Sequence, residues 1–244
     1  MVKGGRVSIP EFTFSLDDDG NTDANSLSLE LGLDLTPTFL ESALDRLVES
    51  RSAYARLLAA DAEDDSEGMG SALKADCKAS LQSVVASVSA VEAFYAVVKL
   101  SGNFVPREMT DSWRRKGTAR RRQVGETLRR AFKQSNQGAM NSKRILKDIY
   151  RWRDWAVHPS AAYSKPAAYP EIRRAVDIRF CQFRYRNSLV VAGCALTLIH
   201  GLMDQGSPQT RELENYCAET LEKIADSKLR YDEEFLEDAK QAGP

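Results

Sequence analysis

The fold class is decided by the stretch Leu81-Gln-Ser-Val-Val-Ala-Ser-Val-Ser-Ala-Val-Glu-Ala-Phe-Tyr-Ala-Val-Val98. Its large apolar residues recur at steps of three and four, which is the pattern of a helix with one buried stripe. The members of that stripe are Leu81, Val84, Val88, Val91, Tyr95 and Val98. Ser71 can cap such a helix and Ser101-Gly102-Asn103 can end it, so the sequence predicts one long helix over residues 71–100.

Further apolar stripes of the same period predict helices on both sides of this stretch. The stretch 61–70 is acidic and ends in glycine, which is the composition of a mobile linker. The sequence therefore predicts a mainly α protein whose centre is a bundle of four to five helices. The expected parts are an N-terminal β arm (1–36), a flanking helix and linker (37–70), the helical bundle (71–205) and a C-terminal helix and tail (206–244). Within them, the expected helices include 37–60, 139–157, 176–204 and 210–240.

The N-terminal arm alternates apolar and polar residues in two runs, residues 6–16 and 26–35. Alternation with β-branched and aromatic residues predicts strands, and the acidic, Gly- and Asn-containing stretch 17–25 between them predicts a turn or loop. The two runs are therefore expected to pair as a β-hairpin. A lone hairpin is marginally stable in water, so it is expected to pack on the helices or on another copy of the chain.

Charge is distributed unevenly along the 244 residues, although the formal net charge is −1. Residues 1–70 hold 5 basic and 15 acidic residues, whereas residues 107–153 hold 15 basic and 4 acidic residues. The densest basic positions predict a surface for nucleic-acid phosphates. They are Arg114, Arg115, Lys116, Arg120, Arg121 and Arg122. The acidic stretches 17–23 and 61–67 could in addition fold over this basic region and act as an internal mask.

A second informative stretch is Arg151-Trp-Arg-Asp-Trp-Ala-Val-His-Pro159, which holds one of the two histidines of the chain. Histidine, arginine and aspartate are the residue types that proton transfer and phosphate stabilisation need. Arg151, Asp154 and His158 share a helix face, whereas Arg153 is well around a regular helix from His158. Pro159 disfavours helical geometry at His158, so a loosened helix end could bring Arg153 closer. Geometry alone leaves Arg151 and Arg153 both open as the functional arginine.

Arg153-Asp154-x-x-x-His158 resembles the Arg-polar-x-x-x-His signature of the HEPN family, helical domains found in toxin–antitoxin and antiviral nucleases. Ser87-x-x-x-x-Glu92-Ala-Phe94 is similar to a stretch in the early helix of those domains. The family often has Asn where this chain has Asp154, a mild departure. The resemblance implies a HEPN-like bundle and a metal-independent endoribonuclease, and the lack of a signal peptide predicts that the protein is cytoplasmic. It also implies a site shared by two subunits of a homodimer and the possibility of an antitoxin partner protein.

In that reading, the RNA 2′-hydroxyl attacks the adjacent phosphate, and His158 acts as general base or acid. Arg153, or alternatively Arg151, stabilises the transition state, and Asp154 orients the imidazole or the arginine. The alternative is a non-catalytic HEPN-like module for nucleic-acid binding or dimerisation, in which these residues are structural. Glu92 is open to a role in the site or to that of a solvated or capping carboxylate. His200, inside an apolar stretch, is expected to be a core or interface histidine.

The sequence contains no motif for a metal site, a bound cofactor or a serine hydrolase. Cys77, Cys181, Cys194 and Cys217 form no C-x-x-C pair, which indicates reduced structural thiols and no metal site. Phosphate-loop, dinucleotide-binding, zinc and serine-hydrolase motifs do not occur, so no cofactor is expected. The N-terminal residues show no signal peptide. The most apolar run, 188–203, falls short of the ~20 residues of a membrane span and predicts a core helix.

Overall fold

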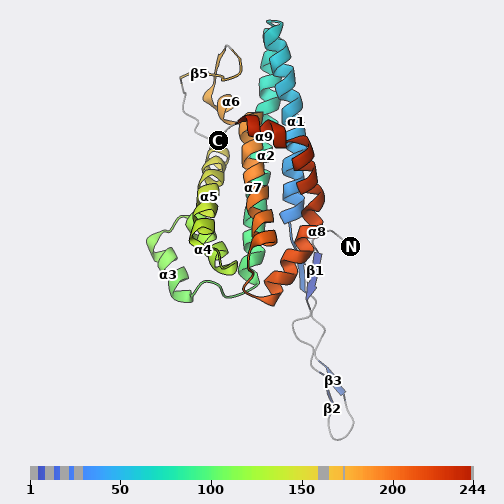
Figure 1. Ribbon diagram of the computed structural model, residues 1–244, viewed down its shortest axis with the longest axis vertical. Coiled ribbons are helices and arrows are strands. Elements are labelled where there is room, and N and C mark those ends of the chain that lie inside the picture. The colour runs from blue at the N-terminus through green and yellow to red at the C-terminus, as the bar shows by residue number, and fades with distance from the viewer. Residues whose placement is uncertain are drawn as a thin grey trace. The chain divides into compact units, whose positions relative to one another are not determined.

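A computed structural model describes the strands 5–8, 14–16 and 22–24, and then residues 30–158, 165–172 and 174–242. By contacts between residues, the chain divides into two units, Met1–Leu35 and Thr36–Pro244. The first unit contains strands, and the second contains the nine helices of the described residues (Figure 1). The prediction of a mainly α protein is confirmed, whereas a bundle specific to the HEPN family stays a prediction.

The first unit holds the predicted hairpin. Strand β1 (Gly5–Ser8) pairs antiparallel with β4 (Glu30–Leu33), and β2 (Phe14–Leu16) pairs antiparallel with β3 (Thr22–Ala24). Both pairings match residue i with residue 38 − i, so the two strand pairs share one register, as a single hairpin requires. Strand β3 lies inside the stretch 17–25, so the prediction of a loop is wrong for residues 22–24.

The second unit begins with a helical hairpin, α1 (Thr36–Ala62) and α2 (Ser66–Leu100). The predicted linker over 61–70 is wrong, and so is the predicted cap at Ser71. Asp65 caps α2 instead, because its carboxylate accepts hydrogen bonds from the backbone N–H groups of Glu67 and Gly68 at 3.2 and 3.0 Å. A side chain at Gly68 would collide with that carboxylate. The glycine therefore belongs to a tight helix start and not to a flexible linker.

The basic region forms two helices, α3 (Arg107–Lys116) and α4 (Arg120–Ala131), separated by Gly117 in the left-handed conformation (φ 59°). Helix α5 (Asn136–Val157) follows and is capped by Ser135, so it starts three residues earlier than predicted. Gly117 explains the break, because left-handed backbone suits a residue without a Cβ.

The two later predicted helices are each broken in the structure. Residues 176–204 form strand β6 (Ala175–Val176), which pairs with β5 (Ala167–Ala168), and the helices α6 (Ile178–Gln182) and α7 (Tyr185–Gln205). The buried carboxylate of Asp76 accepts a hydrogen bond from the Tyr185 N–H at the start of α7, which supports the break there. The C-terminal stretch forms α8 (Arg211–Glu234) and α9 (Leu236–Ala242).

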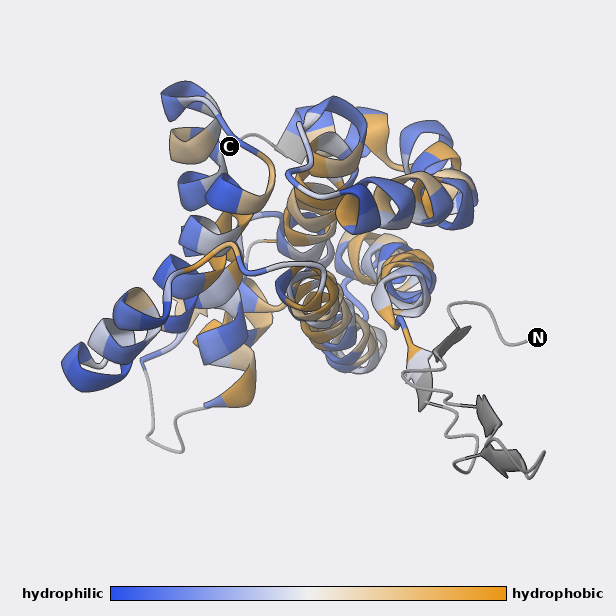
Figure 2. Ribbon diagram, turned by 90° about the horizontal axis from the view of Figure 1, so that it is seen from below, coloured by the Kyte–Doolittle hydropathy of each residue, from blue (hydrophilic) through white to orange (hydrophobic). Residues whose placement is uncertain are grey.

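Most of the core is one cluster to which α1, α2, α4, α5, α7 and α8 all contribute, and a smaller cluster joins the end of α1, the start of α2 and residues 169–172. Helix α2 supplies Val91, Phe94 and Val98, each fully buried, so the predicted stripe on this helix faces the core. Hydrophobic residues gather along the helices in the middle of the bundle, and hydrophilic residues on the outer helices (Figure 2). The expected flanking helix and C-terminal helix thus share the core of the bundle. His200 is half-buried on α7.

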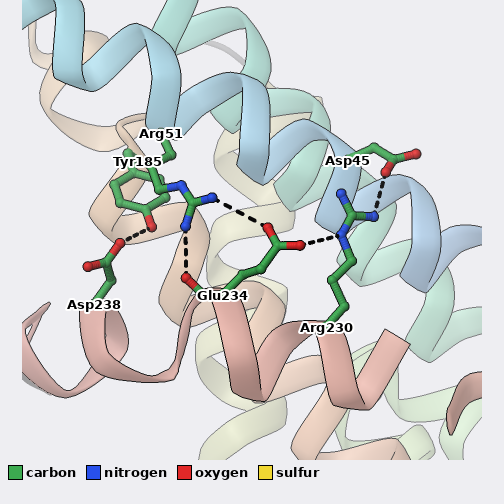
Figure 3. Close-up of polar contacts among 6 residues, drawn as sticks. All are labelled: Asp45, Arg51, Tyr185, Arg230, Glu234 and Asp238. Atoms are coloured by element: carbon green, nitrogen blue, oxygen red, sulfur yellow. Dashed lines mark hydrogen bonds and ion pairs between the residues drawn. The ribbon is translucent and has the colours of Figure 1, made fainter. Parts of the chain in front are cut away.

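The C-terminal helices are fastened to α1 and α7 by polar contacts (Figure 3). Arg51 donates to the backbone carbonyl of Glu234 at 2.8 Å, and Arg230 pairs with Asp45 at 2.7 Å. The Tyr185 hydroxyl, at the start of α7, donates to Asp238 on α9 at 2.5 Å.

Helices α2 and α7 are long and apolar enough to cross a membrane by length and composition. Within the bundle, 56% and 61% of their most apolar windows are buried, as in the core helices of many bundles. The length and composition of these two helices therefore do not indicate a cellular compartment.

Candidate nucleic-acid interface

Helix α5 carries three of the four predicted catalytic residues in its last turns, and the fourth, His158, directly follows the helix. Leu146, Ile149 and Tyr150 are buried on one side of the helix and fix it to the core. Arg151 and Asp154 are exposed, and Arg153 is half-exposed. The sequence places these polar residues beside the buried stripe, so the packing of α5 presents them at the surface.

The helix ends as the sequence predicted. Val157 is its last residue, and His158 leaves helical geometry with φ −120° and ψ 61°. The His158 backbone N–H still donates to the Asp154 carbonyl at 3.0 Å, and its side chain is exposed. Pro159 lies outside the described residues. Arg153 lies over the ring of Tyr150, with 5.9 Å between its guanidinium carbon and the ring centroid, and among the described residues it forms no hydrogen bond with His158.

A cavity of about 470 Å³ joins the two predicted groups of residues. From α5 it is lined by Arg151, Arg153 and Asp154, and from the start of α4 by Arg120 and Arg121. We call this cavity the basic groove; its remaining lining residues are Ala119, Lys147, Tyr150 and Trp155. His158 does not line it. The structure thus unites the arginines of the motif with part of the basic stretch and leaves the histidine outside.

Five cationic side chains and one carboxylate line the basic groove. Asp154 lies 3.5 Å from Arg153, and Asp148 lies 3.7 Å from Arg151, both as surface ion pairs of small strength. Arg121 and Lys147 form no ion pair with any residue that the structure describes. Helix α4 begins at the groove without a side-chain cap, so its first backbone N–H groups add partial positive charge there.

Glu92 of α2 connects the two helices that line the basic groove. Its carboxylate accepts hydrogen bonds from Arg120 at 2.7 and 3.1 Å and from the Tyr150 hydroxyl at 2.5 Å. The Arg120 guanidinium carbon also lies 4.4 Å from the centre of the Tyr95 ring. Glu92 thus ties α2 to both α4 and α5, and it is neither the solvated nor the capping carboxylate that was one of the alternatives.

The electrostatics of this cluster follow from its pairing. Burial alone would raise the pKa of Glu92, but hydrogen bonds from Arg120 and Tyr150 and the charges of Arg120 and Arg153 outweigh it, so the pKa is lowered. The same contacts raise the pKa of Arg120, and burial and Glu92 raise that of Tyr150. Glu92 therefore stays ionised and keeps Arg120 in a fixed position.

Two tryptophans flank the groove on α5. The rings of Trp152 and Trp155 meet edge to face at a centroid distance of 4.9 Å, and Arg151 lies over Trp155 at 5.4 Å. Trp155 remains 38% exposed and Val157, two residues later, 49% exposed. An apolar surface is therefore exposed beside the cationic one at the end of α5.

The rest of the predicted phosphate surface does not belong to the groove. Arg114 lines a separate cavity, whereas Arg115, Lys116 and Arg122 are exposed elsewhere on α3 and α4. These last three make no ion pair with the described part of the chain. One of the two acidic segments that were expected to cover the basic region does not do so. Residues 61–67 form the turn between α1 and α2, where Asp64 pairs with Arg174.

Sequence reasoning missed Lys147 and the supporting role of Tyr150. Lys147 lies four residues before Arg151 and seven before Asp154, so helical spacing could have placed it on the same face. The contact of Glu92 with Arg120 joins residues 28 positions apart and has no such local signal.

Among the described residues, no group of three or more His, Cys, Asp or Glu could hold a metal ion. The four cysteines are free thiols. A scan against protein-family models, a search of curated proteins and a search of solved structures each found no match to this chain.

Proposed function

We propose that this protein binds RNA through backbone phosphates in the basic groove. The observation that carries the proposal is the convergence of Arg120, Arg121, Lys147, Arg151 and Arg153 from two helices on one open cavity. Arginine presents a planar set of donors that matches phosphate oxygens, and the uncapped start of α4 favours the same charge. Such contacts give affinity and register and carry no sequence specificity of their own.

Salt dependence and a matched pair of variants test this proposal. Arg121→Ala removes a groove arginine that has no ion pair within the described chain, and Arg122→Ala removes its exposed neighbour, which does not line the groove. With a single-stranded RNA, the first change should weaken binding roughly five- to tenfold and reduce the salt slope by about 0.7. The second should change affinity by less than about twofold. Equal effects of both variants would refute the groove as the binding site.

RNA cleavage is a second candidate function, which rests on the resemblance to the HEPN family. It is favoured by the exposed position of His158, one turn beyond the groove residue Asp154. In this reaction, the 2′-oxygen attacks the adjacent phosphorus and the bond to the 5′-oxygen breaks. His158 takes the proton of the 2′-hydroxyl or donates one to the 5′-oxygen. The products carry a 2′,3′-cyclic phosphate and a 5′-hydroxyl.

Cleavage requires a histidine near the bound phosphate, and His158 does not line the groove of its own chain. A homodimer around a two-fold axis resolves this, because each subunit then contributes His158 to the phosphate held by its partner. The exposed Trp155 and Val157 supply apolar surface for such an interface beside the groove.

The test of cleavage uses EDTA and two histidine variants. Wild type and His200→Ala should both cut total RNA, since His200 lies on a different helix, whereas His158→Ala should not cut and should still bind. Cleavage by His158→Ala at the wild-type rate would remove the catalytic assignment and leave the binding function in place.

A further inference from the structure

A second cavity, of about 390 Å³, adjoins the basic groove through a shared residue, Arg120. It is formed by the end of α2, the connection 101–106, helix α3 and the first half of α4. Its volume lies near the lower limit of small-molecule sites, about 300–1,000 Å³. The cavity therefore suits one compact group and not an extended segment of chain.

Trp113 supplies an aromatic wall from α3. Among the described helices of ten residues or more, α3 alone has no buried residue, so Trp113 is not part of the core. Its ring is half-exposed and stacks on no other aromatic ring of the described chain, whereas Trp152 and Trp155 pack against each other. Part of the Trp113 ring is thus available to a flat ligand.

The opposite wall is fixed by packing. A Cβ at Gly102 would lie 2.8 Å from the Phe104 ring, so the glycine allows this buried ring to lie against the backbone. Thr210, just before α8, donates to the Ser101 carbonyl at 2.9 Å and holds the same connection. The cavity is therefore preformed on this side.

The polar side chains of the cavity are amides, cations and hydroxyl groups. The Gln123 side chain donates to the Thr118 carbonyl at 2.7 Å, which fixes the amide and leaves its oxygen as an acceptor. Asn103 adds an exposed second amide, and Lys99 lies on the lining without an ion pair among the described residues. No carboxylate is among the lining residues that the structure describes. This combination matches a flat ring with hydrogen-bonding edges that is attached to a phosphate.

We propose that this cavity receives one unpaired base of the RNA strand whose backbone crosses Arg120 into the basic groove. The inference rests on the proposed RNA-binding function and adds that the bound RNA is single-stranded at this position. The base stacks on Trp113 and presents its edge to Gln123 and Asn103, while Lys99 meets the adjoining phosphate. Arg120, fixed by Glu92 and Tyr95, separates the base from the phosphates in the groove.

The test compares two octamers, a single-stranded RNA and the same sugar–phosphate backbone without bases, on the full-length protein. Wild type should bind the base-containing octamer about 5- to 100-fold more tightly, the range for stacking one base on an aromatic side chain. Trp113→Leu should lose this preference and keep its affinity for the abasic octamer. Trp113→Phe, which retains a ring, should keep most of the preference.

A purely structural role of Trp113, as an anchor for α3, predicts a different result. Trp113→Leu would then weaken both octamers equally or neither, and that outcome would overturn the inference. A preference that persists in Trp113→Leu would also overturn it. If that variant does not fold, the emission of Trp113 in a Trp152→Phe, Trp155→Phe background replaces it. That emission should be quenched by the base-containing octamer and not by the abasic one, and equal quenching by both would refute the cavity.

The inference and the proposed function fail in distinguishable ways. Equal binding of both octamers, still weakened by Arg121→Ala, removes the base cavity and leaves the groove. A preference that depends on Trp113, with Arg121→Ala without effect, retains the cavity and removes the groove. Binding of neither octamer removes both.

Discussion

The two halves of α2 each hold a carboxylate beneath the surface, and their surroundings are opposite. Asp76 is 1% exposed and accepts hydrogen bonds from hydroxyl groups and one backbone N–H. Burial, which its hydrogen bonds only partly offset, raises its pKa to about 6. Glu92 is half-buried and is paired with Arg120, and its pKa is lowered.

This difference separates a structural role from a site-forming one. Asp76 joins Ser50 of α1, Ser80 of α2 and the N-terminus of α7, so its partners lie inside the bundle. Glu92 joins α2 to Arg120 of α4 and to the Tyr150 hydroxyl of α5, both of which line the open groove. A carboxylate that is paired with arginines beside an open cavity orients those arginines, whereas one among hydroxyls organises helices.

The largest expected effect is that of Asp76→Ala. The change leaves the Ser50 and Ser80 hydroxyls and the Tyr185 N–H without their acceptor in a closed core. We expect the free energy of unfolding to fall by about 2–4 kcal/mol at pH 5. Urea denaturation measures this change, with Asp76→Asn, which keeps one acceptor oxygen, as the matched and milder control. A loss below about 0.5 kcal/mol for Asp76→Ala would contradict the structural role.

The next effect is a dependence on pH of opposite sign for the two carboxylates. The pKa of Asp76 rises on folding from 3.8 to about 6, so between these values the folded state binds more protons and stability falls as pH rises. The fall is on the order of 3 kcal/mol and ends near pH 6. Glu92, whose folded pKa is lowered, contributes stability above its ordinary pKa of 4.5 that is lost as pH falls through the folded value.

The difference in the free energy of unfolding between wild type and each variant isolates the contribution of one carboxylate. Urea denaturation from pH 3 to 8 is run on wild type, Asp76→Asn and Glu92→Gln. The difference from Asp76→Asn should decline between pH 4 and 6, and the difference from Glu92→Gln should grow with pH in the acidic range. Curves of equal slope for the two differences would show that the environments of the carboxylates are not opposite.

The surroundings of these two carboxylates could be predicted only in part from the sequence. The apolar stripe of α2 predicted its buried face, because helical periodicity is a local property. The partner of Glu92 is 28 residues away and that of Tyr185 is 109 residues away, and both pairings depend on how helices pack. The basic groove has the same origin, since Arg121 and Arg151 become neighbours only when α4 lies against α5.

The predictions of secondary structure that were wrong have local causes. Asp65 and Gly68 have the composition of a linker, but the same residues make a tight helix start when the flanking helices pack together. The sequence analysis gave Gly117 no role within the basic stretch, and its left-handed conformation divides α3 from α4. The motif at the end of α5 was placed correctly on a helix, and its histidine was not predicted to lie outside the groove.

Glu92→Gln is expected to have an intermediate effect. The amide cannot form the ion pair with Arg120, and its NH₂ group is adjacent to the guanidinium. We expect stability at pH 7 to fall by about 1–2 kcal/mol, measured by urea denaturation. RNA affinity reports on positioning. If Glu92 holds Arg120 in place, affinity falls despite the added positive charge. If affinity rises, the carboxylate acts mainly by neutralising the groove.

The two tyrosines that donate to these carboxylates allow a finer comparison, and one of them gives the smallest expected effect. The Tyr150 hydroxyl lies 2.5 Å from Glu92, and the Tyr169 hydroxyl lies 3.4 Å from Asp76. Tyr150→Phe removes a short bond to an ionised acceptor and should cost about 1–2 kcal/mol, whereas Tyr169→Phe removes a long bond and should cost about 0.5 kcal/mol or less.

Both tyrosine changes delete one hydroxyl oxygen from a buried ring and keep every apolar atom of that ring. The difference between the two variants, measured by urea denaturation at pH 7, therefore reports the hydrogen bonds alone. Because the Asp76 carboxyl is largely protonated at pH 5, the effect of Tyr169→Phe should be smaller there, whereas that of Tyr150→Phe should not change. A larger loss for Tyr169→Phe than for Tyr150→Phe would reverse the assignment of Glu92 as the more strongly paired carboxylate.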